Sequence, residues 1–113
     1  MKHDKVYLVH ISECIDRIER YTKDGRTAFT KSTLIQDGVI RNLQTLGQSV
    51  VKISDSLKER HPEVDWRNII GFRNVAAHAY FAMKWPMVWV IATEQVPKLR
   101  SRIAAILDAA SDE

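Results

Sequence analysis

The sequence predicts an all-α protein, an antiparallel bundle of four to five helices joined by short loops. Apolar residues recur at spacings of three and four along most of the chain, and no segment shows the alternation typical of a strand. Proline and glycine fall in short spacers between these segments, so consecutive helices should lie antiparallel. With 113 residues, the chain fits one domain, residues 1–113, at a size where oligomerisation helps to bury apolar surface.

The first helix is expected over about residues 4–22, where four aliphatic residues share one face: Leu8, Ile11, Ile15 and Ile18. The second is expected to be the longest, since its apolar residues keep the helical period for six turns: Ile35, Val39, Leu43, Leu46, Val50, Ile53 and Leu57. Thr33 and Gln36 have the form of a capping box at its start. The stretch KERHPEVD should end this helix.

The remaining helices are marked by three prolines. Pro62 suits the start of a third helix, over about residues 63–82, and the stretch KWP should end it. Pro86 suits the first turn of a fourth helix that runs to about residue 95. Pro97 should kink or restart that helix, followed by a last amphipathic segment with Leu99, Ile103 and Ile106.

Composition limits the function classes. The net charge of +3 and a pI near 9.2 are compatible with a polyanionic partner, but the basic residues are dispersed. Cys14, the single cysteine, has no partner for a disulfide or a four-ligand metal site, and we expect it to be buried. No apolar run is long enough for a membrane span and the start lacks a signal peptide, so we expect a cytoplasmic protein without a membrane partner.

The most informative stretch is RNVAAHAY, residues 73–80. If Arg73 defines zero on a helical wheel, Tyr80 falls at about −20°, Asn74 at about 100° and His78 at about 140°. The core face lies on another arc, made of Ile69, Phe72, Val75, Ala76 and Ala79. A second apolar strip, between Arg73 and Asn74, should pack against another helix or another copy of the chain: Trp66, Ile70, Ala77 and Phe81.

These residue types favour chemistry without a metal or cofactor. No carboxylate occurs between Asp65 and Glu94, whereas magnesium and manganese prefer oxygen ligands. Histidine transfers protons near neutral pH and arginine binds phosphate, a combination suited to RNA cleavage by its own 2′-hydroxyl. That reaction needs both a base and an acid. Two motif helices brought together in a two-fold dimer would supply two histidines.

Other interpretations of the motif remain open at this point. Arg73 could be paired with an acid from another helix, His78 could be bonded to Asn74, and Tyr80 could be an interface aromatic. The protein would then be a non-catalytic helical dimerisation or binding module. A metal-dependent nuclease is a third possibility, which cleavage in the presence of a chelator would exclude.

RNVAAHAY resembles the Arg-x4-His-x-Tyr motif of HepT-like toxins, a branch of the HEPN superfamily. The similarity extends over nearly the whole chain, through YLVHISECIDRIERY, LIQDGVIRNLQTLGQSVVKIS and VWVIATEQVPKLRSRI in order and spacing. Two departures are visible: Ala79 stands where glycine is frequent in the family, and Gln48 stands where an acidic residue often follows the glycine of the second long helix.

The resemblance implies an all-α, HEPN-like homodimer with a composite, metal-independent ribonuclease site. Arg73 and His78 would be catalytic, and Asn74 would orient the site. It also implies a toxin of a type VII-like toxin–antitoxin pair, whose partner, a minimal nucleotidyltransferase antitoxin, adds AMP to Tyr80.

Overall fold

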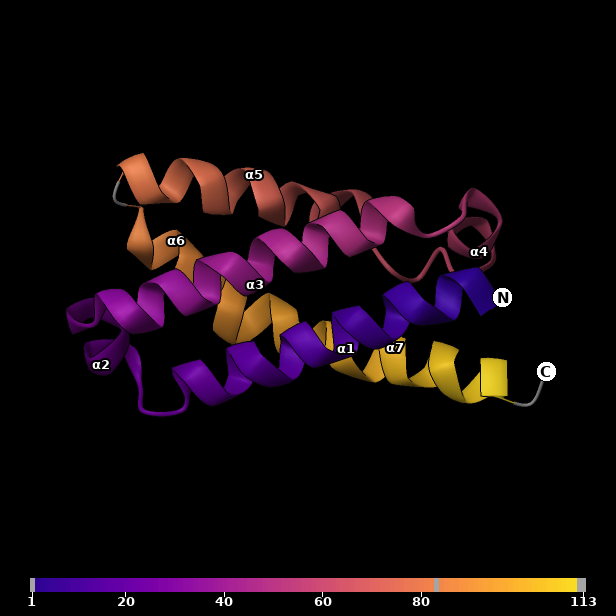
Figure 1. Ribbon diagram of the computed structural model, residues 1–113, viewed down its shortest axis with the longest axis horizontal. Coiled ribbons are helices and arrows are strands. Elements are labelled where there is room, and N and C mark those ends of the chain that lie inside the picture. Colours follow the sequence, from indigo (N-terminus) through magenta and orange to yellow (C-terminus); the bar gives the residue numbers. More distant parts are fainter. Residues whose placement is uncertain (1, 83, 112–113) are drawn as a thin grey trace.

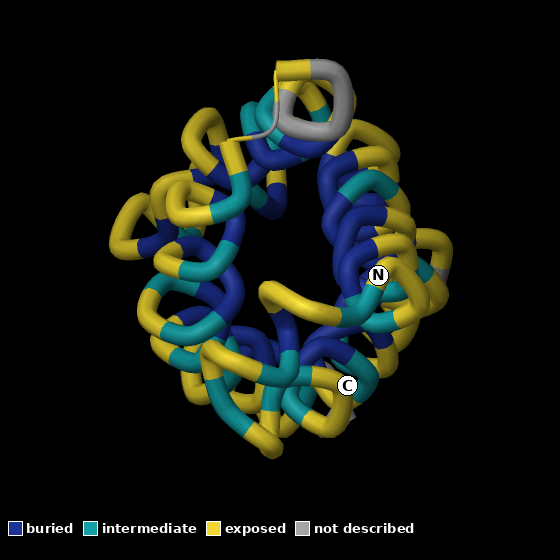
Figure 2. The backbone as a smooth tube through the Cα atoms, turned by 90° about the vertical axis from the view of Figure 1, so that its left-hand side faces the viewer, coloured by how far each residue is buried: buried dark blue, intermediate teal, exposed yellow. Residues whose placement is uncertain are grey.

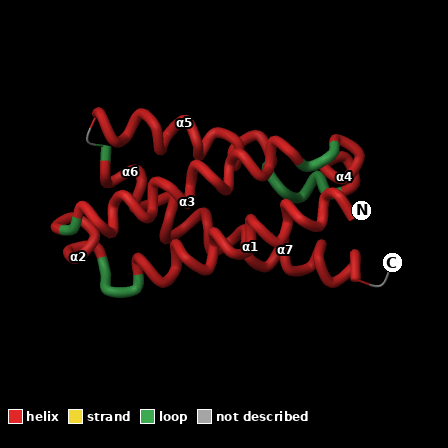
Figure 3. Tube along the Cα trace, viewed as in Figure 1, coloured by secondary structure: helices red, strands yellow, loops and turns green. Residues whose placement is uncertain are grey.

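The chain passes along the length of the molecule four times as helix, in an up-and-down order (Figure 1). The computed structural model describes the backbone of residues 2–82 and 84–111; the side chains of residues 2, 79–81, 110 and 111 lie outside the description. The elements in chain order are α1 (Lys2–Thr22), α2 (Arg26–Lys31), α3 (Thr33–Lys52), α4 (Asp55–Arg60), α5 (Trp66–Ala82), α6 (Trp85–Val90), a π-helical turn (Ile91–Gln95) and α7 (Val96–Ser111). Every regular element in the described residues is helical (Figure 3), which confirms the all-α prediction.

The four long segments form an antiparallel bundle of 45 × 24 × 20 Å. The central helix α3 packs between α1 and α5, and α1 also packs against α7. The helix formed by α6, the π turn and α7 crosses behind α3 and α1 in this view, and the two ends of the chain lie at the same end of the molecule (Figure 1). No helix in the described residues is both long and apolar enough to cross a bilayer.

The core lies where the hydrophobic period places it, on the inward faces of the long helices (Figure 2). Leu8, Ile11, Ile15 and Ile18 of α1 are buried with Val39, Leu43, Leu46 and Val50 of α3. Cys14 is buried among them, as predicted, and this burial raises the pKa of its thiol. On α5, the predicted core residues Ile69, Phe72 and Ala76 are also buried.

Two predictions about the second helix are wrong. The Ser32 hydroxyl caps α3, accepting a hydrogen bond from the Ile35 amide at 3.1 Å, so Thr33 does not form the predicted capping box. The helix also ends at Lys52 rather than continuing for six turns, because Ile53 adopts an extended conformation (φ −71°, ψ 140°). Ser54 then begins α4, and Leu57 remains buried there.

An aspartate from the start of the chain binds the segment between α3 and α4. The Asp4 carboxylate accepts hydrogen bonds from the Ser54 amide at 2.8 Å and from the Ser54 hydroxyl at 2.7 Å. Burial opposes the ionisation of Asp4, but these hydrogen bonds outweigh it and hold the pKa of Asp4 below its ordinary value. Because Asp4 lies in the first turn of α1, the pair joins the start of α1 to the start of α4.

The short helix α2 is absent from the sequence prediction. It buries Phe29, whose ring lies 5.3 Å from that of Trp89 and 6.1 Å from that of Trp85, measured between centroids. Gln36, predicted to cap α3, instead donates its side-chain amide to the carbonyls of Phe29 and Thr30. These contacts fix α2 against α3 and α6.

The C-terminal half also differs in detail from the prediction. The third helix begins at Trp66 rather than near residue 63. At its start, the Asp65 carboxylate accepts a hydrogen bond from the backbone amide of Asn68 at 3.2 Å. The predicted kink at Pro97 appears as the π turn Ile91–Gln95, directly before the turn that contains this proline. Proline has no amide hydrogen to donate to the carbonyl four residues earlier, as a regular α-helix requires. The wider π turn before Pro97 lets the helix continue without that hydrogen bond.

Candidate functional site

The motif helix α5 lies close to α3 at one glycine. A β-carbon on Gly47 would lie 3.0 Å from the Arg73 β-carbon, 3.2 Å from the Arg73 amide nitrogen and 3.3 Å from the Ile70 carbonyl oxygen. Glycine therefore suits this approach, since a β-carbon would force one of the two helices to shift. The predicted second strip of α5 faces α3 here: Trp66 is buried and Ile70 is half-buried, whereas Ala77 is exposed.

This close approach places Arg73 against the exposed face of α3. Its Nη1 donates a hydrogen bond of 3.4 Å to the Gln48 side-chain oxygen, and the arginine is half-buried. Gln48 occupies the position where the resembling family often has an acid. No carboxylate in the described part of the chain forms an ion pair with Arg73, and its side chain donates instead to the uncharged Gln48.

Arg73 opens onto a groove between the two helices, which we call the α3–α5 groove. It has a volume of about 620 Å³ and is lined by side chains that can donate hydrogen bonds, together with Ala77: Arg41, Gln44, Thr45, Gln48, Arg73 and Asn74. No carboxylate occurs among the described residues that line it. The groove is therefore suited to an anionic group.

His78 lies on the other side of Asn74, as the helical wheel predicts. It lines a smaller hollow of about 260 Å³, the histidine hollow, with Asn74, Val75, Lys84 and Met87. Asn74 thus borders both hollows. No hydrogen bond joins Asn74 to His78 within the described residues, and both side chains are exposed, so the interpretation that His78 is bonded to Asn74 is wrong.

Tyr80 follows His78 in the last part of α5, but its side chain lies outside the described part of the structure. The predicted acceptor hydroxyl therefore has no geometry to report. The same holds for Phe81 and for Ala79, which replaces the glycine frequent in the resembling family.

A larger apolar hollow, of about 700 Å³, adjoins the histidine hollow between α5 and α6. Val75 and Met87 line both hollows, so the two are neighbours on one surface. Met87 is 47% exposed and Val90 is 43% exposed, and both line this apolar hollow. We call this surface the α5–α6 face.

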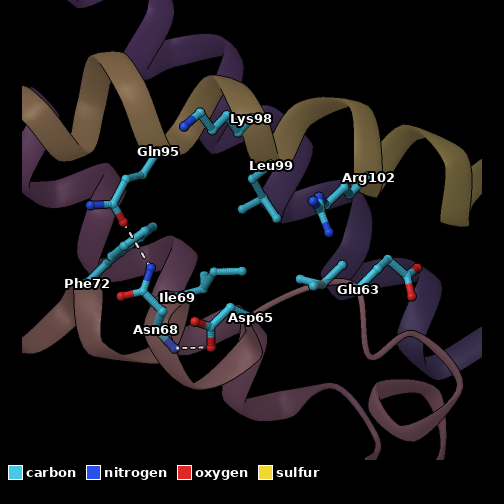
Figure 4. Close-up of a pocket in the computed structure, with 10 residues that line it drawn as sticks. Glu63, Asp65, Asn68, Ile69, Phe72, Gln95, Lys98, Leu99 and Arg102 are labelled. Atoms are coloured by element: carbon cyan, nitrogen blue, oxygen red, sulfur yellow. Dashed lines mark hydrogen bonds between the residues drawn. The ribbon is translucent and has the colours of Figure 1, made fainter.

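A fourth hollow, of about 210 Å³, lies at the opposite end of α5 and contains charged residues of both signs, including Glu63, Lys98 and Arg102 (Figure 4). Across it, Asn68 donates from its side-chain amide to the Gln95 oxygen at 2.9 Å (Figure 4). The polar groups of Asn68 and Gln95 thus pair with one another and join α5 to the π turn. This hollow is a helix junction rather than a candidate active site.

The described residues contain no group of three metal-ligating side chains close enough to hold an ion. Sequence analysis did not assign two α3 residues to the site: Gln48, which accepts a hydrogen bond from Arg73, and Arg41, which lines the same groove. Their only sequence signal is the spacing of seven residues, which places both on the face of α3 opposite the core.

Comparison with known proteins gives a consistent result. Residues 11–106 match the model of a family described as ribonuclease HepT-like. A "probable ribonuclease HepT" of Thermococcus cleftensis is 32% identical over 87% of this chain and 90% of its own length. A "putative RNase" of Methanocaldococcus jannaschii is 30% identical over 90% of this chain and 94% of its own length.

A second Methanocaldococcus jannaschii protein, named "gamma-glutamylcyclotransferase and putative RNase", is 31% identical over 95% of this chain. The chain spans only 49% of that relative's length, so it corresponds to about half of it. No solved structure matches the chain.

Proposed function

The chain belongs to the ribonuclease HepT-like family, and from this premise we propose that it is a metal-independent endoribonuclease that acts as a toxin. The observation that carries the proposal is the arrangement of α5. Arg73 borders an acid-free groove, His78 is exposed on the adjacent surface, and Asn74 lies between them. The relatives named as ribonucleases support the same activity.

In the proposed reaction, one His78 accepts the proton of an RNA 2′-hydroxyl as its oxygen attacks the adjacent phosphorus. The bond from phosphorus to the 5′-oxygen breaks, and a second His78 donates a proton to that oxygen. The products are a 2′,3′-cyclic phosphate and a 5′-hydroxyl. Arg73 holds the phosphate and stabilises the charge that develops on it, and Asn74 orients the site.

A second histidine requires a second copy of the chain. The α5–α6 face supports a homodimer, because Met87 and Val90 expose apolar surface that another copy would bury. The face adjoins the histidine hollow at Val75 and Met87. A two-fold contact there would bring the two motif helices near one another.

The cleavage experiment compares purified wild type, Arg73→Ala and His78→Ala on single-stranded RNA in the presence of EDTA. Arg60→Ala and His10→Ala serve as matched controls, since both residues are exposed and lie on other helices. We expect wild type and both controls to cleave and to leave cyclic phosphate ends, and both motif variants to lose activity. Intact RNA with stoichiometric wild type would favour the non-catalytic binding module, and dependence on a metal would refute the mechanism.

The dimer is tested separately by light scattering after size-exclusion chromatography. Val90→Asp should convert a wild-type dimer into a monomer, because it places a charge in an apolar contact. Leu34→Asp is a matched control, since Leu34 is 82% exposed on α3. A dimer that survives Val90→Asp would place the interface elsewhere.

We also propose that the partner is a minimal nucleotidyltransferase antitoxin that adds AMP to Tyr80. A nucleotide phosphate two residues after His78 would add bulk and negative charge near the site where RNA phosphate binds. In cells, we expect wild type and Tyr80→Phe both to arrest growth, and the antitoxin to rescue only wild type. Rescue of Tyr80→Phe would show that neutralisation does not depend on this tyrosine, and a mass increase of one AMP or more would count the modifications.

A further inference from the structure

The α3–α5 groove continues beyond Arg73 to a second arginine. Arg41 is exposed on α3 and lines the same groove. It lies seven residues before Gln48, which contacts Arg73, so the two positions on α3 are about 10 Å apart along the helix axis. Because α3 and α5 run antiparallel (Figure 1), Arg41 lies toward the C-terminal end of α5, past Ala77.

The side chains between the two arginines are uncharged and polar. Gln44, Thr45 and Gln48 line the groove in this interval, and each can donate a hydrogen bond. The nearest carboxylate along α3 is Asp37, one turn before Arg41, and the two form no ion pair in the described structure. The positive charge of Arg41 is therefore available to a ligand.

From this arrangement we propose that the α3–α5 groove binds the phosphodiester backbone of single-stranded RNA, with Arg41 holding a phosphate next to the one that is cleaved. The inference rests on the proposed ribonuclease function. Amides and hydroxyls commonly bind backbone phosphate and sugar alongside arginine. The described lining residues are suited to phosphate and sugar rather than to base edges, so we expect binding here to show little sequence preference.

Binding is tested with a fluorescent 2′-O-methyl RNA of about ten nucleotides, a length within the usual range for such sites. The protein cannot cleave this probe through the proposed reaction, because its 2′-oxygens are blocked. Arg41→Gln is compared with Arg60→Gln, which removes the same charge from exposed helix α4. Circular dichroism shows that each variant is folded.

We expect Arg41→Gln to weaken binding by about fivefold, the upper range for an exposed ion pair. It should also reduce the slope of log affinity against log salt by about 0.7, since one phosphate contact to a single strand is lost. Arg60→Gln should bind as wild type does. Gln44→Glu, which adds a carboxylate within the groove, should weaken RNA binding at least as much as Arg41→Gln does. Equal binding by Arg41→Gln and Arg60→Gln, or no binding by wild type, would overturn the proposal.

Cleavage of unmodified RNA by the same preparations separates this inference from the proposed function. If wild type binds the probe through Arg41 but leaves RNA intact, the proposed ribonuclease function is refuted and the proposed RNA binding in the groove is supported. If wild type cleaves RNA and Arg41→Gln raises neither KM nor the dissociation constant for the probe, the proposed RNA binding in the groove is refuted and the proposed ribonuclease function is supported. The expected result is a higher KM in Arg41→Gln with little change in kcat.

Discussion

Replacing Gly47 by alanine should separate α5 from α3 at the candidate site. The added β-carbon would lie 3.0 Å from the Arg73 β-carbon and 3.2 Å from the Arg73 amide nitrogen. Carbon atoms prefer about 3.5–4.0 Å, so the contact is too short by about half an ångström. Neither neighbouring atom belongs to a flexible side-chain end, so the backbone of α3 or α5 has to shift by a few tenths of an ångström to relieve the overlap.

The size of the effect follows from two opposing contributions. Overpacking of this kind lowers the free energy of unfolding by about 1–3 kcal/mol, whereas the higher helix propensity of alanine raises it by about 1 kcal/mol. Gly71→Ala is the matched control, because Gly71 is also inside a helix but a β-carbon there meets nothing within 4 Å. Gly71→Ala should raise the free energy of unfolding by up to about 1 kcal/mol. The difference between the two variants isolates the overpacking cost, about 2 kcal/mol.

The measurement is urea unfolding followed by far-UV circular dichroism, repeated at several protein concentrations so that any contribution of dimerisation to each variant's stability is seen. RNA cleavage is measured in parallel, where Gly47→Ala should lower the rate by about tenfold, because a displacement of roughly half an ångström is smaller than the 1 Å that costs about 100-fold. If Gly47→Ala and Gly71→Ala stabilise the protein equally, the close approach at Gly47 does not restrict residue size and the reasoning is refuted.

Two further predictions concern contacts that hold the bundle. Asp4→Asn should cost about 2 kcal/mol at neutral pH, because the charged acceptor of the Ser54 hydrogen bonds is lost. Since the pKa of Asp4 is lowered in the folded state, this stabilisation is present above its ordinary value of 3.8 and is lost as pH falls through the folded pKa, so urea unfolding of wild type and variant should converge in acid. Arg100→Gln should cost about 1 kcal/mol, since Arg100 of α7 pairs with both Asp16 and Glu19 of α1 but is 39% exposed at its side chain. High salt should reduce this difference between wild type and Arg100→Gln, and an unchanged difference would contradict an electrostatic origin.

The sequence was sufficient to predict which faces of the long helices are buried. Each inward residue of α1 and α3 repeats the helical period, because both helices pack along their whole length. The period failed at Ile53, since Ile53 and Leu57 stay buried whether or not the helix continues. The break depends on Asp4, 50 positions away, which no local pattern reveals. Helix α2 was missed because six residues are too few for a period to be visible.

For the candidate site, the helical wheel correctly separated Arg73 from His78 but could not identify the neighbours of either residue. Gln48 contacts Arg73, and Arg41 lines the same groove, where Gly47 lets α3 and α5 lie close together. That distance is a tertiary property, fixed by an absent side chain rather than by a charged or polar one. A sequence pattern therefore predicts the residues of one helix more readily than a site that spans two.

The separation of Arg73 from His78 limits what one copy of the chain can do. Arg73 opens onto the α3–α5 groove and His78 onto the histidine hollow, with Asn74 between them. Direct contact of both side chains with one phosphate would require the RNA to cross over Asn74, and even then one histidine would have to serve as both base and acid. In a dimer formed through the α5–α6 face, the second copy would bring its own His78 toward this boundary. The proposed reaction thus requires the dimer, and a Val90→Asp monomer that remains folded should retain RNA binding in the groove but lose cleavage.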